Sequence, residues 1–571
     1  MTLAGIVRRF RNRICLEIDL GRWAFRTRRF KYVVPPKPLE RTVLFCDLMS
    51  GVSTAKVEAL LAAVLRNHGY RTTVLLRRRS PIFERIFRAV GPARFIYLEK
   101  LLTPEIRKKA RVRAGLLIEQ MNDTASLLAL EERGFRIGRN VLSLVLREVR
   151  SGKLDFNNAS QKARTREVLA ESLAVIAACD RLLDETAPDL AVFNERGYTP
   201  AGEVFDACHL RGIDTVQWLG APQSDCLLFK RFSLANRGTH PLALSDETWI
   251  WLQRQPWTEN AEKQLMEKLS SHYESGTWFN RQKLQEGKTI KTKEEVYAQL
   301  NLDPAKKTAV IFCHILYDAT FFYGESLFSD YETWLVETVG AAIDNPALNW
   351  VVKAHPVNVW RSKSDGAAME QLEAKALHAA FGELPDHVRF MPADTDINTF
   401  SLFGAIDYGL TVRGTIGMEL PCFGIPVVTA GTGRYSGRGF TLDPSTAEAF
   451  RNLLRHLHEV PRLSADEISL ARRYAYGTFF LRPVLMKSFR LDFHANSFNL
   501  TELATNVDLL QSNGKAFLAA PDIQAISRWM TDEQTLDMLA DEAATFGETF
   551  PPHAHQNAGK HDFKHLAEEE L

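Results

Sequence analysis

The sequence predicts an α/β protein in which two doubly wound domains face each other across a cleft. Its 571 residues exceed the roughly 100–200 residues of a single domain. Short runs of apolar and β-branched residues alternate with helical stretches, and this alternation occurs in two successive parts of the chain. Strands buried on both faces have such continuous apolar runs, so each part is expected to be a Rossmann-like domain built on a parallel sheet.

The first part consists of a basic leader, residues 1–40, and an N-terminal domain over residues 41–275. The stretch from about 100 to 185 is rich in Leu, Arg and Glu, which predicts a helical insertion. The other expected elements are a strand at 41–51, a helix at 54–67, a strand at 70–76, a strand at 190–195 and a strand at 214–220. Their strand–helix–strand order is typical of the opening of a Rossmann-like unit.

The second part begins with a polar linker, residues 276–306, and continues as a C-terminal domain over residues 307–490. Residues 491–571 are expected to form a helical or poorly ordered tail, whose four histidines are interpreted as solvated side chains: His553, His555, His561 and His565. The expected strands of the domain lie at 307–315, 349–355, 387–392, 407–412 and 425–431. Its expected helices lie at 331–343, 367–381 and 397–404, with one more beginning at Thr415.

Charge and cysteine usage restrict the compartment and the partners. The net charge of +2 does not indicate a nucleic-acid partner, and the seven cysteines are scattered without a C-x-x-C spacing, which argues against disulfides and structural zinc. We expect a cytoplasmic protein, because the chain has no signal-like apolar region and no spanning apolar run. A cluster near the N-terminus predicts peripheral binding to the anionic inner face of a membrane: Arg8, Arg9, Arg11, Arg13, Arg22, Arg26, Arg28, Arg29 and Lys31.

Two strand ends of the second domain carry residues suited to a nucleotide. In parallel sheets, ligands bind beyond the carboxyl ends of the strands. Lys353 and His355 follow one strand and can donate to phosphate oxygens. Gly414 and Thr415 follow another strand and open a helix whose free N–H groups can cradle phosphate. One turn later, Glu419 is placed to accept the hydroxyls of a ribose.

A glycine-rich loop, residues 431–441, follows the last predicted strand. It carries Arg434, Tyr435 and Arg438 at the same edge of the sheet. Glycines in such a loop are compatible with ordinary turns, but two arginines beside a proposed phosphate site favour anion binding.

These three segments resemble the capsule polysaccharide biosynthesis family. The matching elements are KAHP at 353–356, GTIGMELPCFGIPVV at 414–428 and GTGRYSGRGFT at 431–441, all within residues 307–480. The resemblance implies a GT-B fold, with an activated sugar bound mainly by the C-terminal domain and the acceptor by the N-terminal one. The family includes Kdo transferases that use a CMP-linked sugar. On this analogy His355 contacts the nucleotide phosphate and Glu419 the ribose.

Catalysis requires a carboxylate or histidine near the reactive carbon of the sugar. Loops expected to face the cleft supply Asp47 and the pair Glu195-Arg196 from the first domain, and His314 and Asp318 from the second. Among these, Glu195 and Asp318 are favoured, with His314 as a further candidate.

The D-x-D pattern at Asp394 and Asp396 is interpreted as structural, with Asp396 as the N-cap of the next helix. We therefore expect no catalytic metal and no cofactor besides the nucleotide-sugar substrate.

The resulting hypothesis is a glycosyltransferase that acts on a surface or capsular polysaccharide or a lipid-linked acceptor. A teichoic-acid-like glycerol- or ribitol-phosphate transferase and a nucleotide-sugar epimerase are the alternatives. A third alternative is a non-catalytic protein of a capsule assembly complex that keeps the same fold. The presence of a full set of site residues argues against it: Lys353, His355, Gly414, Thr415 and Glu419.

Overall fold

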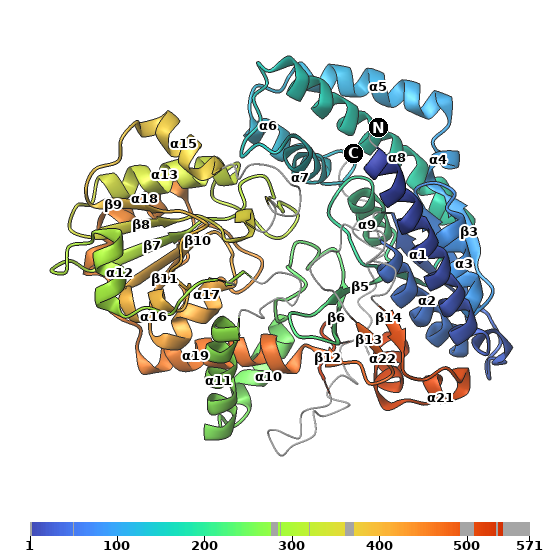
Figure 1. Cartoon of the computed structure of the whole chain (residues 1–571). Coiled ribbons are helices and arrows are strands. Elements are labelled where there is room, and N and C mark those ends of the chain that lie inside the picture. Colours follow the sequence, from blue (N-terminus) through green and yellow to red (C-terminus); the bar gives the residue numbers. More distant parts are fainter. Residues whose placement is uncertain are drawn as a thin grey trace, which may run out of the picture.

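The protein folds into two α/β units placed side by side (Figure 1), as seen in a computed structural model. The structure describes residues 3–48, 51–275, 284–285, 287–318, 320–359, 362, 371–491, 507–532 and 535–540, and of residues 3–10 and 12 the backbone alone.

The first unit is built on a seven-stranded sheet with the order β12-β6-β5-β4-β1-β2-β3. Strands β1 to β5 are parallel, whereas β6 and β12 run antiparallel to their neighbours. The strands are β1 Arg41–Asp47, β2 Tyr70–Leu76, β3 Arg94–Tyr97, β4 Leu190–Phe193, β5 Asp214–Gly220, β6 Cys226–Phe232 and β12 Val484–Leu485. The predicted parallel sheet is therefore confirmed, and its antiparallel edge comes from pairings that the pattern of apolar runs did not indicate.

Helices cover both faces of this sheet because successive strand residues point to opposite sides. In β1, Val43 and Phe45 pack toward α1 Leu3–Thr27, α2 Val52–Asn67 and α3 Pro81–Val90. Leu44 and Cys46 pack toward the helices of the predicted insertion. These and the next helix are α4 Leu98–Leu101, α5 Pro104–Ile118, α6 Thr124–Leu128, α7 Ile137–Val149, α8 Ala159–Thr186 and α9 Ala201–Leu210.

The second unit has a fully parallel five-stranded sheet with the order β11-β10-β7-β8-β9. One face packs on α13, α15 and α18, and the other on α12, α16 and α17. The strands are β7 Thr308–Phe312, β8 Asn349–Lys353, β9 Val388–Met391, β10 Tyr408–Thr411 and β11 Val427–Thr429. The helices are α12 Lys293–Leu300, α13 Tyr331–Ile343, α15 Leu372–Phe381, α16 Ser401–Ala405, α17 Ile416–Glu419 and α18 Ala447–Arg455. The two doubly wound domains of the prediction are thus both present.

Asp396 does not have the predicted role of helix N-cap. The helix that follows it begins only at Ser401, and its N-cap is Phe400. The Asp396 carboxylate instead binds the Lys291 ammonium at 2.6 Å and the Gln299 amide at 2.7 Å. The aspartate therefore fastens the described end of the linker region to the second unit.

The C-terminal part of the chain returns to the first unit. Strand β12 joins the first sheet, and the segments after it pack in the same core as α1, α2 and α3. The elements that connect or follow the units are α10 Asp246–Arg254, α11 Glu259–Ser275, α19 Ala465–Tyr476, a π-helical turn Gly477–Leu481, β13 Phe489–Leu491, β14 Val507–Leu509, α21 Gly514–Leu518 and α22 Pro521–Thr531. The described part of the predicted tail contains strand β14 and helices α21 and α22, which pack on the first unit, while the four tail histidines lie outside the described residues.

A buried ionic cluster fastens this returning segment. Asp537 Oδ1 lies 2.6 Å from Lys230 Nζ on β6 and 3.0 Å from Arg482 Nη1. Its Oδ2 accepts the backbone N–H of Ser245 at 2.6 Å. All three charged side chains are almost fully buried. The two cations keep the pKa of Asp537 well below its usual range, although burial acts in the opposite direction.

We predict that Asp537→Ala lowers the free energy of unfolding by about 3–5 kcal/mol, because it leaves two buried cations without their carboxylate. Urea denaturation should show the loss. The control is Asp508→Ala, since Asp508 is exposed and its ion-pair partner among the described residues is Arg26 at 3.4 Å; exposed pairs contribute about 0–1 kcal/mol. Equal effects of the two substitutions would contradict the buried cluster.

Candidate active site

The strand orders place a topological switch point in each sheet. The connections after adjacent strands run toward opposite edges of the sheet between β1 and β4 in the first sheet and between β7 and β10 in the second. Ligands of open parallel sheets bind at such points. The loop after β7, residues 313–330, meets the first unit here: Arg139 of α7 donates to the carbonyls of Phe321 at 3.4 Å and Gly324 at 3.1 Å.

Lys353 ends β8 as a buried cation without a counter-charge. Its side chain is 7% exposed, and it forms no ion pair among the described residues. Burial, with the nearby Lys288 ammonium, lowers the pKa of Lys353 to about 7. Such a cation is costly in the empty protein and would be compensated by a bound anion.

His355 follows the same strand. Its Nδ1 accepts the backbone N–H of Val357 at 3.2 Å, so the neutral ring carries its proton on Nε2. The structure thus brings Lys353 and His355 to one strand end, as the sequence predicted, with one ammonium and one imidazole donor.

Two arginines approach from the other side of the β7 strand end. Arg413 follows β10 and donates from Nη2 to the Glu325 carbonyl at 2.9 Å. Arg434 of the glycine loop lies with its Nη2 2.5 Å from Nε2 of His240 in the first unit. Burial lowers the pKa of both guanidinium groups.

Several donor atoms of these arginines lack partners. Nε and Nη1 of Arg413 and Nε of Arg434 are buried without a hydrogen bond in the part of the chain that the structure describes. An unsatisfied buried donor costs roughly 1–3 kcal/mol, more when it is charged. Together with Lys353 and His355, they form the cationic cluster, a group of buried and half-buried donors at the switch point that matches the oxygens of a phosphate.

Sequence reasoning did not include Arg413 in the site. Its position could have indicated it, because Arg413 is the second residue after the end of strand β10, at the switch point. Arg434, which was predicted, lies close enough to Arg413 for the Arg413 charge to add to the lowering of the Arg434 pKa that burial causes.

His314 lies between the two halves of the cluster, but it is already engaged. Its Nε2 accepts the backbone N–H of Val412 at 3.1 Å and is 3.0 Å from the Thr411 hydroxyl. Burial lowers its pKa well below the usual range. The neutral ring therefore joins β7 to β10, and its predicted part in catalysis stays a prediction.

The turn after β10 is fixed by Tyr435 from within the protein. The Tyr435 hydroxyl donates to the Gly414 carbonyl at 2.7 Å and would collide with a Cβ at position 417. This explains the glycine at 417. Helix α17 has only four residues before a 3-10 turn, so the helix expected to begin at Thr415 is short. Tyr435 therefore stabilises the turn after β10 and does not point away from it.

Arg438 serves the junction between the units. Its Nη2 donates to the Leu244 carbonyl at 3.2 Å and lies 2.7 Å from the Asp246 carboxylate. In the glycine-rich loop, Arg434 thus belongs to the cationic cluster, whereas Arg438 contacts the first unit.

Glu419 is fully buried below the cluster. Its Oε2 accepts the hydroxyl of Tyr273 from the last turn of α11, while Oε1 has no hydrogen-bond partner among the described residues. Burial raises the pKa of the carboxyl group. The predicted ribose contact therefore requires either Oε1 or the departure of Tyr273.

Two of the predicted catalytic carboxylates, Glu195 of the first unit and Asp318 of the second, lie near Arg147. Glu195 follows β4 and accepts the backbone N–H of Arg196 at 2.8 Å and of Gly197 at 3.2 Å. Burial raises its pKa, which makes the carboxylate a stronger base. Arg147 lies 3.8 Å from Asp318 and also acts electrostatically on Glu195, so it brings the two units' candidates together.

Asp47 and Arg196 have different surroundings. Asp47 is buried near Glu58, and burial, followed by the Asp47 charge, raises the pKa of Glu58 well above its usual range. Arg196 donates to the carbonyls of Arg237 and Thr239, each at 2.6 Å. It therefore supports the backbone that carries His240 rather than facing a ligand.

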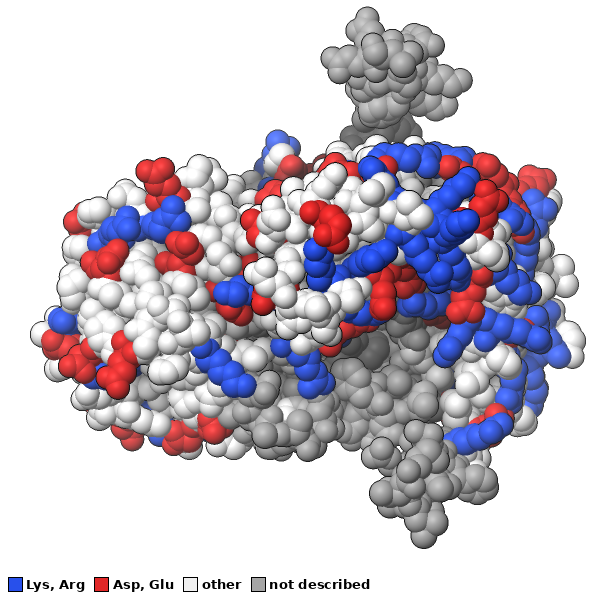
Figure 2. Space-filling model, turned by 90° about the horizontal axis from the view of Figure 1, so that it is seen from above, with Lys and Arg blue, Asp and Glu red and all other residues white. Residues whose placement is uncertain are grey.

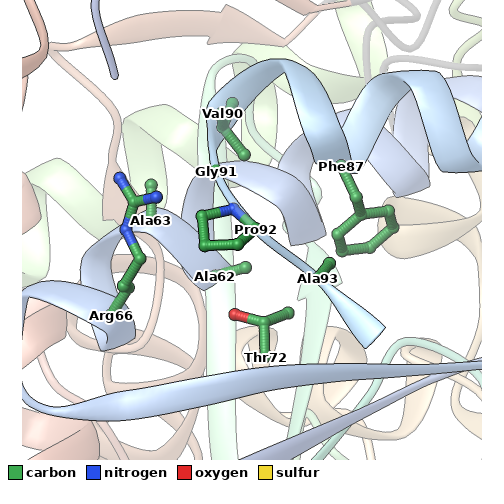
Figure 3. A pocket seen from close by; sticks show the side chains of 9 residues that line it. All are labelled: Ala62, Ala63, Arg66, Thr72, Phe87, Val90, Gly91, Pro92 and Ala93. Atoms are coloured by element: carbon green, nitrogen blue, oxygen red, sulfur yellow. The ribbon is translucent and has the colours of Figure 1, made fainter. Parts of the chain in front are cut away.

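A small pocket lies elsewhere, between α2, β2 and α3 (Figure 3). Its lining includes Arg66 at the end of α2 and Thr72 near the start of β2, which places it toward the amino ends of the strands. None of the predicted site residues lines it.

Comparisons with known proteins show weak similarity in structure. No family model and no curated protein matches the chain. A beta Kdo 2,4 transferase (KpsC) of Thermosulfurimonas dismutans is 15% identical, with 58% of this chain and 88% of that chain covered and a TM-score of 0.32.

A UDP-GlcNAc 2-epimerase of Neisseria meningitidis is 10% identical, with 77% and 96% covered and a TM-score of 0.26. A glycosyltransferase of Rickettsia africae is also 10% identical, with 86% and 99% covered and a TM-score of 0.24. Values this low do not distinguish activities, so the function is argued from the site.

We predict that Lys353→Met stabilises the protein without ligand, raising Tm at pH 8 by about 2 °C or more. The folded-state pKa of about 7 is below the unfolded value of about 10.4, so the unfolded state binds more protons between them. Wild-type stability should therefore rise with pH across this window, and the variant should lose that slope.

Thermal unfolding between pH 6.5 and pH 10 measures both effects. Lys263→Met is the control, because the Lys263 side chain is 73% exposed. A Tm that falls in Lys353→Met, or a slope that survives, would show that Lys353 is compensated within the protein.

Proposed function

We propose that the protein is a glycosyltransferase that binds a nucleotide-activated sugar in the second unit and transfers the sugar to a glycan acceptor at the first. The single observation that carries this proposal is the cationic cluster of Lys353, His355, Arg413 and Arg434 around the β7–β10 switch point. Among the described residues, the buried Lys353 forms no ion pair, and three buried donor atoms of Arg413 and Arg434 form no hydrogen bond. A nucleotide phosphate supplies the missing negative charge and acceptor oxygens.

The same groups serve the reaction. As the bond between the sugar and the phosphate breaks, negative charge grows on the leaving phosphate, and buried preorganised cations stabilise that charge. In this proposal the protein's own cations provide the stabilisation that a metal ion provides in other transferases. The fold of two facing units and the resemblance of residues 353–356 and 414–441 favour a CMP-linked donor.

Glu195 is the proposed general base. It lies at the carboxyl end of β4 in the first unit, where the acceptor is expected, and burial raises its pKa. It would accept the proton of the attacking acceptor hydroxyl while Asp318 and Arg147 hold the loop between the units. The proposed acceptor is a surface or capsular polysaccharide or a lipid-linked glycan.

Nucleotide binding tests the proposal first. We expect CMP at about one hundred times its dissociation constant to stabilise the wild type by ~2.7 kcal/mol in a thermal-shift assay, and Arg413→Gln to abolish most of this effect. CDP, UDP and GDP are screened in parallel.

Arg438→Gln, from the same side of the sheet, is the matched control. Its guanidinium binds Leu244 and Asp246 and not the cluster, so its nucleotide response should equal that of the wild type. Stabilisation by CDP or UDP alone would favour a phosphate transferase or another sugar donor, and turnover of a donor without acceptor would favour an epimerase. No response to any nucleotide would refute the proposal.

A separate prediction concerns the sugar of the nucleotide. If Glu419 accepts ribose hydroxyls, the wild type should bind CMP at least about tenfold more tightly than 2′,3′-dideoxy-CMP, since a hydrogen bond to a charged group contributes about 1.5–3 kcal/mol. Glu419→Gln should remove most of this preference, as measured by calorimetry. Tyr273→Phe frees Oε2 and should retain the preference or increase it. Equal affinities in the wild type would assign Glu419 a purely structural role.

A further inference from the structure

Helix α1 has two apolar faces. Leu16, Leu20 and Trp23 are buried against the first unit, and the Trp23 indole donates to the Ile86 carbonyl of α3 at 3.1 Å. Other apolar residues of the helix are exposed: Ile14 by 45%, Ile18 by 52% and Phe25 by 66%.

The exposed residues form one stripe. Positions 14, 18 and 25 are separated by four and seven residues, a spacing that puts them on one side of an α-helix. Leu16, Leu20 and Trp23 occupy the opposite side. A surface helix needs a single apolar stripe for packing, so a second stripe left exposed by the described residues indicates a further binding partner.

Positive charge borders the outer stripe. Arg11, Arg22 and Arg29 are exposed beside it and form no ion pair in the described part of the chain. Arg28 places its guanidinium 3.7 Å from the centre of the Phe25 ring.

The nearby acidic residues do not offset this charge. Glu17 is paired with Arg85 at 2.8 Å, and Asp19 is buried with Lys56 at 2.6 Å. Figure 2 shows more Lys and Arg side chains over the first unit, on the right, than over the second, with acidic side chains among them on both sides.

We propose that the outer face of α1 inserts into the headgroup region of an anionic lipid bilayer. An apolar stripe bordered by arginines is the pattern of a helix that lies in the plane of the interface. Ile14, Ile18 and Phe25 enter the acyl boundary while the flanking arginines bind anionic headgroups. In the part of the chain that the structure describes, no helix has the length and hydropathy needed to cross a bilayer.

This proposal adds a contribution that charge alone does not provide. A purely electrostatic surface would bind through arginines and release at moderate salt. The apolar stripe adds an anchoring component that does not depend on salt, because burial of apolar area is not screened. The inference does not depend on the nucleotide site and would hold for another activity at that site.

Co-sedimentation with vesicles tests the proposal. We expect the wild type to bind phosphatidylglycerol-containing vesicles, and the triple substitution Ile14→Ser, Ile18→Ser and Phe25→Ser to lower the partition coefficient at least about tenfold. The matched control replaces three equally exposed apolar residues away from α1 with Ser, namely Leu234 (49% exposed), Ile250 (47%) and Ile290 (50%). This control should bind as the wild type does.

The electrostatic contribution is tested separately with Arg11→Gln, Arg22→Gln and Arg29→Gln. Each charge near the surface contributes about fivefold to binding of anionic vesicles, so the triple variant should bind these much more weakly. Its binding to pure phosphatidylcholine should not change.

Two outcomes would overturn the proposal. One is unchanged partition of the serine triple variant. The other is a wild-type dimer in multi-angle light scattering that becomes monomeric in this variant, which would make a second copy the partner of the stripe. The CMP-induced thermal shift of every variant should match that of the wild type, so failure here is distinguishable from failure of the proposed function.

Discussion

The buried charge cluster of Asp537, Lys230 and Arg482 is the constraint on which the junction of the two units depends. Its three members come from the C-terminal segment, β6 and the end of the π-helical turn, and all three bind backbone of residues 241–245. That short segment is also where the second unit attaches: Arg438 donates to the Leu244 carbonyl, and the Leu244 N–H donates to the Tyr474 hydroxyl. The two ion pairs and the hydrogen bonds of these side chains to the backbone hold the three segments together. The glycine loop with Arg434 is positioned against that arrangement.

The cationic cluster at the β7–β10 switch point differs from the Asp537 cluster because its positive charges have no carboxylate paired with them among the described residues. Asp537 is paired with two cations, whereas Arg413 and Arg434 have buried donors that no described residue satisfies, and the buried Lys353 forms no ion pair among the described residues. A protein selected only for stability would replace these cations with apolar or neutral side chains. The cost is understandable if the compensating charge belongs to a ligand. Stability of the empty protein and affinity for an anion are then opposed at the same residues.

The features that could be predicted from the sequence are those that depend on the local pattern of residues. Apolar runs such as those of β1 and β8 identified the strands, and the residues after β8 and β10 predicted the edge at which a ligand would bind. The sequence did not reveal what depends on distant contacts. Arg438 lies in a loop that resembles a phosphate clamp, yet Asp246, nearly two hundred residues away, takes its charge. Likewise the leader was predicted from its arginines alone, and the burial of Trp23 against α3 was not anticipated. The antiparallel pairing of β12 with β6 joins residues more than 250 positions apart, which no window of local periodicity covers.

Glu419 illustrates how ligand recognition and folding use the same chemistry. A buried carboxylate with a raised pKa is best satisfied by neutral hydroxyl donors, and in this structure the Tyr273 hydroxyl provides one. A ribose would offer two. Tyr273 lies in the last turn of α11, which leads into the connection between the units, and its ring packs on Phe400 at 5.7 Å. If a nucleotide displaced the Tyr273 hydroxyl from Glu419, the end of α11 would have to move, because the phenol ring cannot leave its hydrogen bond without leaving that packing. In the proposed function, ribose binding would therefore be coupled mechanically to the segment that joins the two units.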